Sequence, residues 1–571
     1  MRHAQDGGTA PTATAASGHG SAGAGHAHGA TGTRAPGGPP CTYCPRDAEH
    51  TVLHQIVREH LTTFLRAAAE RTGGDGLPAF IEHEFRDFMA CGVWARGFAR
   101  FRCDTCHAER LVPFSCKGRI CPSCAGRRMA ERAAHLVDHV LPAVPIRQWV
   151  LTLPHRLRYQ LAWDHTLCRA VLAVYARALL GFERRRACRR GVADGKTGAV
   201  TAIQRFGSGL NCNLHFHTLV LDGVYTADTA GTLRFDPAPP PTDREVARLV
   251  ATIARRIERL LRRRGLAPDD DTATAADPLT EDAPALAELS RASVMGRSVL
   301  GRRPGAPVLR LGRDPDAPWV TSSGPRHAHL QGFDLHANRT VRAHDRIGVE
   351  KLCQYLLRPP LGQERLEILP DGQICCTLAR PWSDGTQALL FTPIEFLEKL
   401  ASLIPRPHIN LLIYHGALAS HARARPHIIA QVVPLEPAPP TVHDAAAPVS
   451  AVPVTTAPAA AVPTTAAPAA PAASRDAPSP PVDTGDSLAA ERGDSRRRHW
   501  LWAELLRRVF QIDILACTAC GGRLRFIATI EDPPVVQRIL AHVGLPTALP
   551  EASPARPPPA AGDTLAFDFP G

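Results

Sequence analysis

The segment Asn213-Leu214-His215-Phe216-His217-Thr218-Leu219-Val220-Leu221-Asp222-Gly223 is the most informative part of this chain. Its apolar residues, with Thr and Val among them, predict a β-strand that ends in a turn at Asp-Gly. Residues two apart lie on the same face of a strand, so His215 and His217 are expected to point the same way while Phe216 packs behind them. A core strand that happens to carry two histidines is the simpler interpretation of this pair alone. The case for a site therefore depends on what the rest of the chain supplies.

The overall composition limits the class of protein. A chain of 571 residues is too long for one hydrophobic core, so several domains are expected. The formal net charge is +12, and only four of the 66 basic residues are lysines. Arginine binds phosphate through two parallel hydrogen bonds, but a GC-rich genome would produce the same bias. The charge alone is therefore weak evidence for a nucleic-acid partner.

The sequence shows neither a membrane span nor a secretion signal. No apolar run reaches the length of about 18 residues that a spanning helix needs, and the N-terminus lacks an apolar segment. We therefore expect a cytoplasmic protein with no membrane partner. In that compartment the 16 cysteines indicate metal sites or core thiols rather than disulfides.

Periodicity and composition predict an α+β protein made of several parts. Stretches rich in Gly, Ala, Thr and Pro cannot bury a core, and we expect them to be disordered. The predicted parts are a disordered tail (1–40), a helical region with a cysteine cluster (41–145), a region of strands and helices (146–430) with an insertion (266–325), a low-complexity linker (431–497), a small Cys-x-x-Cys module (498–548) and a second disordered tail (549–571).

The cysteine spacing predicts a zinc site. In Cys103-x2-Cys106-x14-Cys121-x2-Cys124, two tight knuckles supply four thiolates for tetrahedral zinc. Four sulfur ligands leave no open position, so this zinc would be structural. Cys91 and Cys116 lie nearby in the sequence, as spare core thiols or as substitute ligands.

A further knuckle, Cys517-x-x-Cys520, has no second pair near it in the sequence. It either pairs with Cys41 and Cys44 across the fold or is a decayed site.

Basic residues surround the first cysteine cluster and recur near the histidine strand. They form either a solvated face or a surface for DNA phosphates, and a zinc knuckle among them favours DNA. The candidate DNA-binding residues are Lys117, Arg119, Arg127, Arg128, Arg205 and Arg358.

A candidate nucleophile follows the histidine strand. Two imidazoles on one face can hold a divalent ion and leave positions open for substrate oxygens. Tyr355, one of six tyrosines, lies on a predicted helix that ends at Arg358-Pro359-Pro360. Tyrosine is a competent covalent nucleophile, although a half-buried core tyrosine is the usual interpretation of such a position.

Several short motifs, each weak alone, form a specific set together. They are Ser115-Cys116-Lys117-Gly118-Arg119 before Cys121-Pro122-Ser123-Cys124, then Val150-Leu151-Thr152-Leu153-Pro154, Gln204-Arg205-Phe206-Gly207-Ser208 before His215-Phe216-His217, Gly332-Phe333-Asp334-Leu335-His336-Ala337, Leu352-Cys353-Gln354-Tyr355, Trp382-Ser383-Asp384-Gly385-Thr386 and Tyr414-His415-Gly416. The set resembles the HUH-type rolling-circle transposases of insertion sequences, in particular the IS91 family and its ISCR relatives. The resemblance covers roughly residues 41–430 and 498–547. It implies a zinc-binding and DNA-binding domain at 41–145 and an HUH catalytic domain of antiparallel sheet with helices at 146–430.

The resemblance implies a mechanism. His215 and His217 would hold the catalytic Mg²⁺ or Mn²⁺, and Tyr355 would attack a phosphodiester of single-stranded DNA at the transposon end. The products would be a 5′-phosphotyrosine and a free 3′-hydroxyl. Some relatives carry two tyrosines four residues apart, but Lys351 stands at the earlier position here. A second transfer would then need a second protomer, as in a homodimer, or reversal through the 3′-hydroxyl. The third metal ligand is unassigned, with Gln354 and His336 as candidates.

Two other functions stay open at this stage. A plasmid replication initiator or a relaxase would use the same chemistry. Residues 191–197 nearly match a phosphate-binding loop but have one residue too few between the glycines, which argues against a helicase-fused version. A catalytically dead, zinc-containing DNA-binding regulator is the alternative from another class.

Overall fold

The computed structural model describes residues 47–229, 231–266, 277–301, 303–317, 324–435, 502–510 and 513–556. The predicted N-terminal tail, Cys41 and Cys44 lie outside the described residues, as do most of the predicted linker and the end of the second tail. The described chain combines helices with antiparallel sheets, as the sequence predicts. No helix within these ranges is long and apolar enough to cross a membrane.

A central sheet of seven strands organises the fold, and all of its pairings are antiparallel. Its order is β15-β4-β5-β3-β10-β9, with β11 also paired to β3. The strands are β3 (Ile146–Thr152), β4 (Gly198–Phe206), β5 (Cys212–Leu221), β9 (His327–Leu330), β10 (Phe333–His336), β11 (Thr340–Val341) and β15 (Leu412–Gly416). The predicted histidine strand is β5, which lies inside the sheet with a neighbour on each edge.

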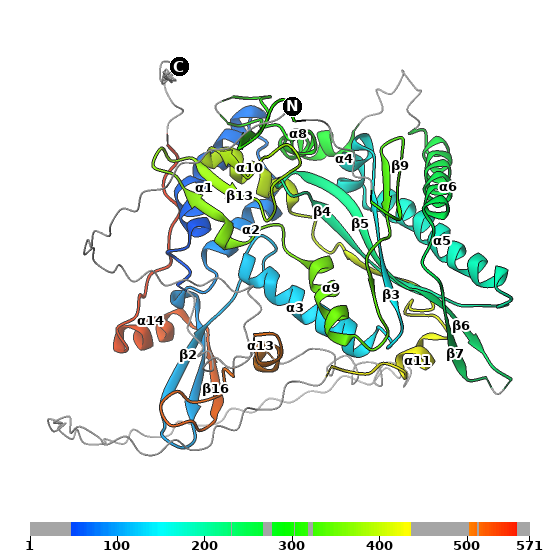
Figure 1. The fold of residues 1–571 in the computed structure, drawn as a ribbon. Coiled ribbons are helices and arrows are strands. Elements are labelled where there is room, and N and C mark those ends of the chain that lie inside the picture. The colour runs from blue at the N-terminus through cyan, green and yellow to red at the C-terminus, as the bar shows by residue number, and fades with distance from the viewer. Residues whose placement is uncertain are drawn as a thin grey trace, which may run out of the picture. The chain divides into compact units, whose positions relative to one another are not determined.

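Helices cover both faces of this sheet (Figure 1). One face packs against α3 (Pro122–His139) and α9 (Arg346–Leu357), with Leu219 of β5 buried among their apolar side chains. The opposite face carries Phe216 and packs against α4 (His155–Trp163), α5 (His165–Arg189) and α6 (Asp243–Arg262). Because β-strand side chains alternate, His215 and His217 belong to the α3 and α9 face, opposite Phe216.

The N-terminal region begins with helices α1 (Val52–Arg71) and α2 (Ala79–Met89) and the short η1 (Trp94–Arg96). A hairpin of β1 (Phe98–Cys103) and β2 (Glu109–Pro113) follows. The next helix, α3, packs on the central sheet, so the zinc-binding region and the catalytic region share buried surface.

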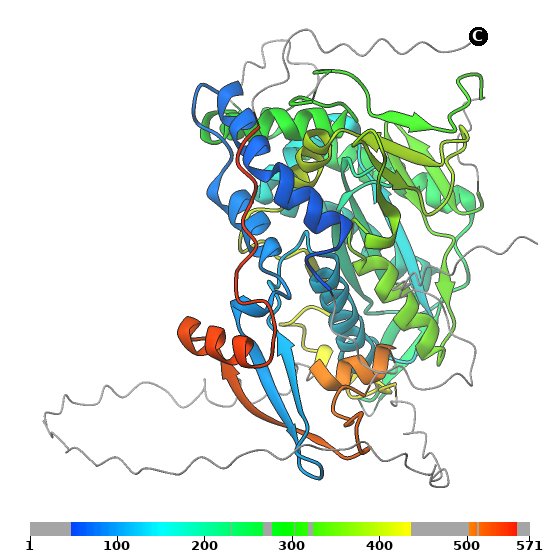
Figure 2. The same cartoon turned by 90° about the vertical axis from the view of Figure 1, so that its left-hand side faces the viewer.

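The chain after the linker does not form a sheet of its own within the described residues. Instead β16 (Leu524–Ile530) pairs antiparallel with β1, so that the order is β16-β1-β2 (Figure 2). Helix α14 (Pro533–His542) packs on Phe98, and α13 (Trp502–Phe510) packs Leu505 on α3. The predicted C-terminal module is therefore the last strand of the N-terminal sheet together with its flanking helices.

Part of the predicted insertion belongs to the core. Helix α8 (Pro284–Val294) buries Leu286 and Leu289 in the main apolar cluster. A further antiparallel sheet consists of β12 (Leu366–Ile368), β13 (Ile374–Thr377), β14 (Ala388–Phe391) and β8 (Leu309–Leu311), in that order, and β8 also comes from the predicted insertion. The remaining elements are β6 (Gly223–Ala227), β7 (Leu233–Pro237), α7 (Pro278–Asp282), η2 (Gln363–Arg365), α10 (Pro393–Leu403) and α11 (Arg425–Ile429).

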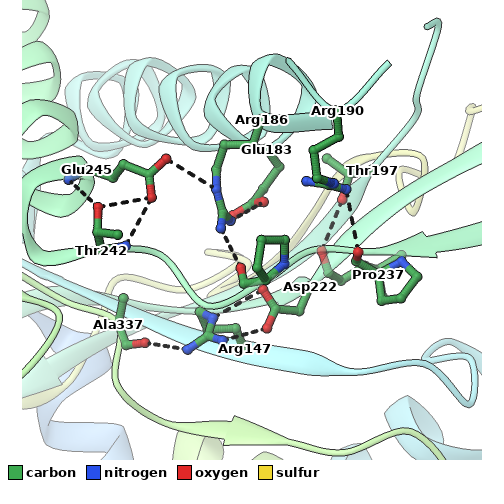
Figure 3. A network of polar contacts seen from close by, with 12 residues as sticks. Arg147, Glu183, Arg186, Arg190, Thr197, Asp222, Pro237, Thr242, Glu245 and Ala337 are labelled. Carbon is green, nitrogen blue, oxygen red and sulfur yellow. Dashed lines mark hydrogen bonds and ion pairs between the residues drawn. The ribbon is translucent and has the colours of Figure 1, made fainter. Parts of the chain in front are cut away.

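A buried ion pair links neighbouring parts of the central sheet at the end of β5 (Figure 3). Arg147 of β3 donates two hydrogen bonds to the Asp222 carboxylate, at 3.1 and 2.7 Å, and a third to the Ala337 carbonyl at 3.0 Å. These side chains are 3% and 5% exposed. The pair therefore joins β3, the end of β5 and the chain after β10 at one buried point.

We expect Asp222→Ala to lower the free energy of unfolding by about 3–5 kcal/mol, because it leaves the Arg147 guanidinium buried without a counter-charge. Asp236→Ala is the matched control. It removes the carboxylate from an ion pair with Arg190 whose side chains are 37% and 28% exposed, and should cost about 1 kcal/mol or less. Chemical denaturation of both variants measures the difference. Equal losses would contradict the assignment of Asp222 as a structural counter-ion.

Candidate active site and cysteine clusters

The two histidines of β5 converge on one point. Their Nε2 atoms lie 2.9 Å apart. The Nδ1 atom of His215 hydrogen-bonds to the Asn213 carbonyl at 2.8 Å, and Nδ1 of His217 lies 2.8 Å from the side-chain amide nitrogen of Gln148 on β3. With both Nδ1 atoms engaged, the two rings are oriented and only their Nε2 atoms face each other.

Burial keeps this pair neutral. Desolvation, the main cause, lowers the pKa of His215 to about 4 and lowers the pKa of His217 well below its usual value. The neighbouring Arg358 guanidinium lowers both pKa values further. A neutral imidazole has the lone pair that binds a metal ion.

The spacing of the pair fits a divalent ion. Two ligands in adjacent positions of an octahedron, each about 2.1 Å from Mg²⁺, lie about 3.0 Å apart. The observed Nε2 separation of 2.9 Å agrees with that value. Within the described ranges, no third histidine, cysteine or carboxylate lies close enough to complete a three-ligand group with them. Of the candidate third ligands, His336 is on β10, opposite Val150 rather than next to β5, and Gln354 precedes Tyr355 on α9.

Tyr355 lies directly beside the histidines although 138 residues separate it from His217. Its ring centroid is 5.8 Å from that of His217, with the rings nearly perpendicular at 80°. Tyr355 is 42% exposed, so a substrate can reach part of this residue. Gln204 of β4 secures the end of α9 by donating a hydrogen bond to the Leu356 carbonyl at 2.6 Å.

Two arginines flank the tyrosine ring. The guanidinium carbon of Arg358 lies 4.3 Å from the Tyr355 ring centroid, and that of Arg339 lies 5.6 Å from it. Arg358 follows the last turn of α9, where Pro359 and Pro360 prevent the helix from continuing. The phenol therefore lies close both to a pair of neutral imidazoles and to two cations that can bind phosphate oxygens.

A basic cavity of about 140 Å³ begins beside this site. It lies between α3, β4, α10 and the end of α9, and five arginines contribute to its lining: Arg119, Arg128, Arg132, Arg205 and Arg358. Four of these are among the candidate DNA-binding residues. The other two candidates, Lys117 and Arg127, are exposed outside the lining.

Arg205 does not suit the DNA-binding role that the sequence suggests. Its side chain is buried, donates a hydrogen bond to the Ala162 carbonyl and lies over the Trp163 ring. A side chain held in this way cannot reach a DNA backbone, so its contacts are those of a packing residue.

The predicted quartet of Cys103, Cys106, Cys121 and Cys124 is wrong, because these residues belong to two separate clusters. The first cluster consists of Cys91, Cys116, Cys121 and Cys124. The second consists of Cys103, Cys106, Cys517 and Cys520.

The β1–β2 hairpin explains the separation. Cys103 ends β1 at the tip of the hairpin, and β2 runs antiparallel back from it, so that Pro113 pairs with Phe98 at the base. The following residues thus return to the region of Cys91, a hairpin length of about 17 Å from the tip.

The first cluster has the geometry of a zinc site. Its Sγ atoms are 3.6 Å apart in the pairs Cys91–Cys121, Cys91–Cys124 and Cys116–Cys124. Four sulfurs about 2.3 Å from a zinc ion would be about 3.8 Å apart. The nearby Cys91 and Cys116 are therefore substitute ligands rather than spare thiols.

Comparison with known families agrees with these findings. A family model described as a putative transposase matches residues 198–425, which include both histidines and Tyr355. A second, described as a transposase zinc-binding domain, matches residues 56–153 and includes all of the first cysteine cluster. Together they cover more than half of the chain.

The chain belongs to the IS91-like transposases. A transposase cleaves DNA and transfers strands, so DNA is the substrate of this IS91-like protein. The zinc-binding family model and the complete first cysteine cluster within it support zinc as a cofactor. No curated protein and no solved structure matches the chain.

Two residues of the site, Gln148 and Arg339, did not stand out in the sequence. Gln148 contacts His217, and its only signal was a polar residue beside Arg147 in a largely apolar strand. The partners of Cys517 and Cys520 were missed as well, since nothing local to that knuckle indicates Cys103 or Cys106.

We expect Cys116→Ser to remove one equivalent of zinc per chain and to lower the unfolding temperature, because an oxygen replaces a thiolate in a four-sulfur site. Cys188→Ser is the matched control, since Cys188 is exposed on α5 outside both clusters. Elemental analysis and a thermal melt of each variant give the result. Unchanged zinc content in Cys116→Ser would rule out this ligand set.

Proposed function

We propose that this transposase nicks and rejoins single-stranded DNA at the ends of its element through a covalent bond to Tyr355, with a Mg²⁺ or Mn²⁺ ion held by His215 and His217. The supporting observation is the contact between the Tyr355 ring and His217 of the histidine pair, 5.8 Å between ring centroids. A partly exposed phenol next to two converging neutral imidazoles is an arrangement suited to metal-assisted phosphoryl transfer to tyrosine.

The chemistry balances with this set of residues. The Tyr355 oxygen forms a bond to phosphorus, and the bond from phosphorus to the 3′ oxygen breaks. The phenolic proton leaves to solvent, and the departing 3′ oxygen takes up a proton to become a hydroxyl. In the joining step a 3′-hydroxyl attacks the phosphotyrosine and releases Tyr355. The phosphotyrosine ester retains the bond energy of the cleaved phosphodiester, so the joining step needs no nucleotide cofactor.

The surrounding residues orient the phosphate. A divalent ion at the histidine pair would withdraw negative charge from the phosphate. Arg358 and Arg339, both close to the phenol ring, would bind the non-bridging oxygens and keep phosphorus within reach of the tyrosine oxygen. Gln148 and the Asn213 carbonyl hold the imidazole rings in place.

The strand would approach over the arginine-lined cavity. Arg119 and Arg128 lie on the α3 side of it, and Lys117 and Arg127 extend the basic surface. Phosphate contacts of this kind bind DNA independently of sequence and weaken as salt concentration rises. The substrate would be DNA of the bacterial nucleoid, in the cytoplasm. Because α9 carries one tyrosine, a second strand transfer would use either a second protomer or the released 3′-hydroxyl.

Tyr355→Phe should abolish the covalent protein–DNA adduct, because it removes only the attacking oxygen. Tyr414→Phe is the matched control, a partly buried tyrosine of β15 whose ring stacks against Arg425. The assay incubates each protein with Mg²⁺ and a labelled single strand carrying an element end, followed by denaturing electrophoresis. An adduct with Tyr355→Phe would assign the nucleophile to another residue.

The same assay separates the alternatives. A replication initiator or relaxase would form the adduct on plasmid origin strands and not on element ends. A catalytically dead regulator would bind the strand, yet wild type would form no adduct on either DNA.

Gln148→Leu should raise the Mn²⁺ concentration for half-maximal adduct formation by about 10–100-fold, the usual effect of removing a residue that orients a metal-binding imidazole. When Nε2 of His217 binds an ion, its Nδ1 carries the proton and needs an acceptor. The Gln148 amide supplies one after a flip, and Gln148→Glu would supply one as well. We therefore expect near wild-type Mn²⁺ dependence in Gln148→Glu. Identical titrations for Gln148→Leu and wild type would exclude this role.

A further inference from the structure

The second cysteine cluster joins the two ends of the described chain. Cys103 and Cys106 flank the tip of the β1–β2 hairpin, and Cys517 and Cys520 lie just before β16. The Sγ atoms of Cys103 and Cys520 are 3.5 Å apart, and those of Cys106 and Cys517 are 3.6 Å apart. All four sulfurs lie within 4.8 Å of one another.

These distances match a tetrahedral metal site and not a pair of disulfides. Four thiolates at the zinc–sulfur distance of about 2.3 Å form a tetrahedron with edges of about 3.8 Å. A disulfide would bring two sulfurs to about 2.05 Å. Four sulfur donors select zinc among the common divalent ions, since magnesium and calcium take oxygen ligands.

The backbone around the C-terminal pair is shaped for sulfur ligands. Gly521 has a φ of +72°, and its N–H donates a hydrogen bond to the Cys517 carbonyl at 2.9 Å, which closes the knuckle. A Cβ atom on Gly522 would lie 3.3 Å from the sulfurs of both Cys103 and Cys520 and 2.7 Å from the Thr105 hydroxyl. The two glycines therefore let the C-terminal knuckle approach the hairpin tip closely.

Few apolar contacts hold this end of β16 in place. The apolar cluster beside the four cysteines contains Leu524 as its one buried aliphatic side chain, and Phe526 is largely exposed although its ring contacts Phe101. The large apolar contacts of the segment come later, where Val536 and Leu540 of α14 pack on Phe98 at the opposite end of β1. At the hairpin tip the links are backbone pairing, the four sulfurs and the hydrogen bonds that Arg110 donates to the Ile514 carbonyl and the Thr518 hydroxyl.

We propose that these four cysteines bind a second structural zinc, which clasps the C-terminal segment to the N-terminal hairpin. The family model for the zinc-binding domain ends at residue 153 and contains only half of this ligand set. The other half, Cys517 and Cys520, comes from the segment after the linker. The site therefore forms only in the tertiary fold, and neither the N-terminal hairpin nor the C-terminal segment contains it alone.

The clasp would also stabilise contacts of the helix before it. Arg508 of α13 forms a buried ion pair with Asp138 of α3 and hydrogen-bonds to Glu350 of α9 at 3.3 Å. Helix α9 carries Tyr355 five residues further on. Fastening residues 517–520 thus keeps α13 close to the helices that it contacts, because a short tether raises its effective concentration there.

Zinc content of the full-length protein tests the site, independently of DNA cleavage. Wild type should contain two equivalents per chain, and Cys520→Ser should contain one. Cys106→Ser should lose the same equivalent, and the Cys106→Ser/Cys520→Ser double variant should lose no more, because both residues serve one ion. Ala519→Ser, an exposed substitution inside the same knuckle, should keep two equivalents. One equivalent in wild type, or additive losses in the double variant, would overturn the proposal.

A cleavable linker tests the clasp itself. A protease site inserted between Ala460 and Ala461 allows the chain to be cut after folding, and gel filtration then shows whether the two pieces stay together. The pieces of the otherwise wild-type and Ala519→Ser proteins should co-elute. Those of Cys517→Ser/Cys520→Ser should separate at least partly, while the N-terminal piece keeps its one zinc. Full co-elution of the cysteine double variant would show that strand pairing suffices and would refute the clasp.

Discussion

Strand β5 is hydrogen-bonded along both edges, to β3 and to β4, and the active site depends on this double pairing. A shift of one residue in either register would turn His215 and His217 to the opposite face, among the side chains that surround Phe216. The observed register places them under α9 and beside Gln148. The Arg147–Asp222 pair at the end of β5 holds this register at a buried point.

The same sheet explains how distant residues meet. Tyr355 follows His217 by 138 residues, yet α9 packs on the sheet face that carries the histidines, and Gln204 of β4 hydrogen-bonds to the end of the helix. Burial then determines the protonation state, since it lowers the pKa of both imidazoles and leaves them neutral. The geometry and the electrostatics of the site thus have one origin, the packing of α3 and α9 on this face.

Local patterns were sufficient for several predictions. The apolar run around His215 and His217, ending in Asp-Gly, predicted the strand, and Pro359 predicted the end of the tyrosine helix, because both signals act over a few residues. The cysteine spacing indicated zinc but assigned the wrong ligands. Cys103 and Cys106 lie at the tip of a hairpin, and β2 leads the chain away from that tip before it reaches Cys121. Nothing in the spacing of two knuckles reveals this separation. The burial of Arg205 could not be foreseen for a similar reason, since burial depends on what packs around a side chain.

The sequence by itself determined the strand that carries the histidines, the helix that carries the tyrosine, the presence of zinc ligands and the resemblance to IS91-like transposases. Each of these is encoded in short motifs whose physical basis is local. Only the tertiary structure decided which cysteines share a cluster, that β16 completes the N-terminal sheet, and that Gln148 and Arg339 adjoin the site. Those contacts join residues far apart in the chain, and they form only because a sheet and its covering helices bury a common core.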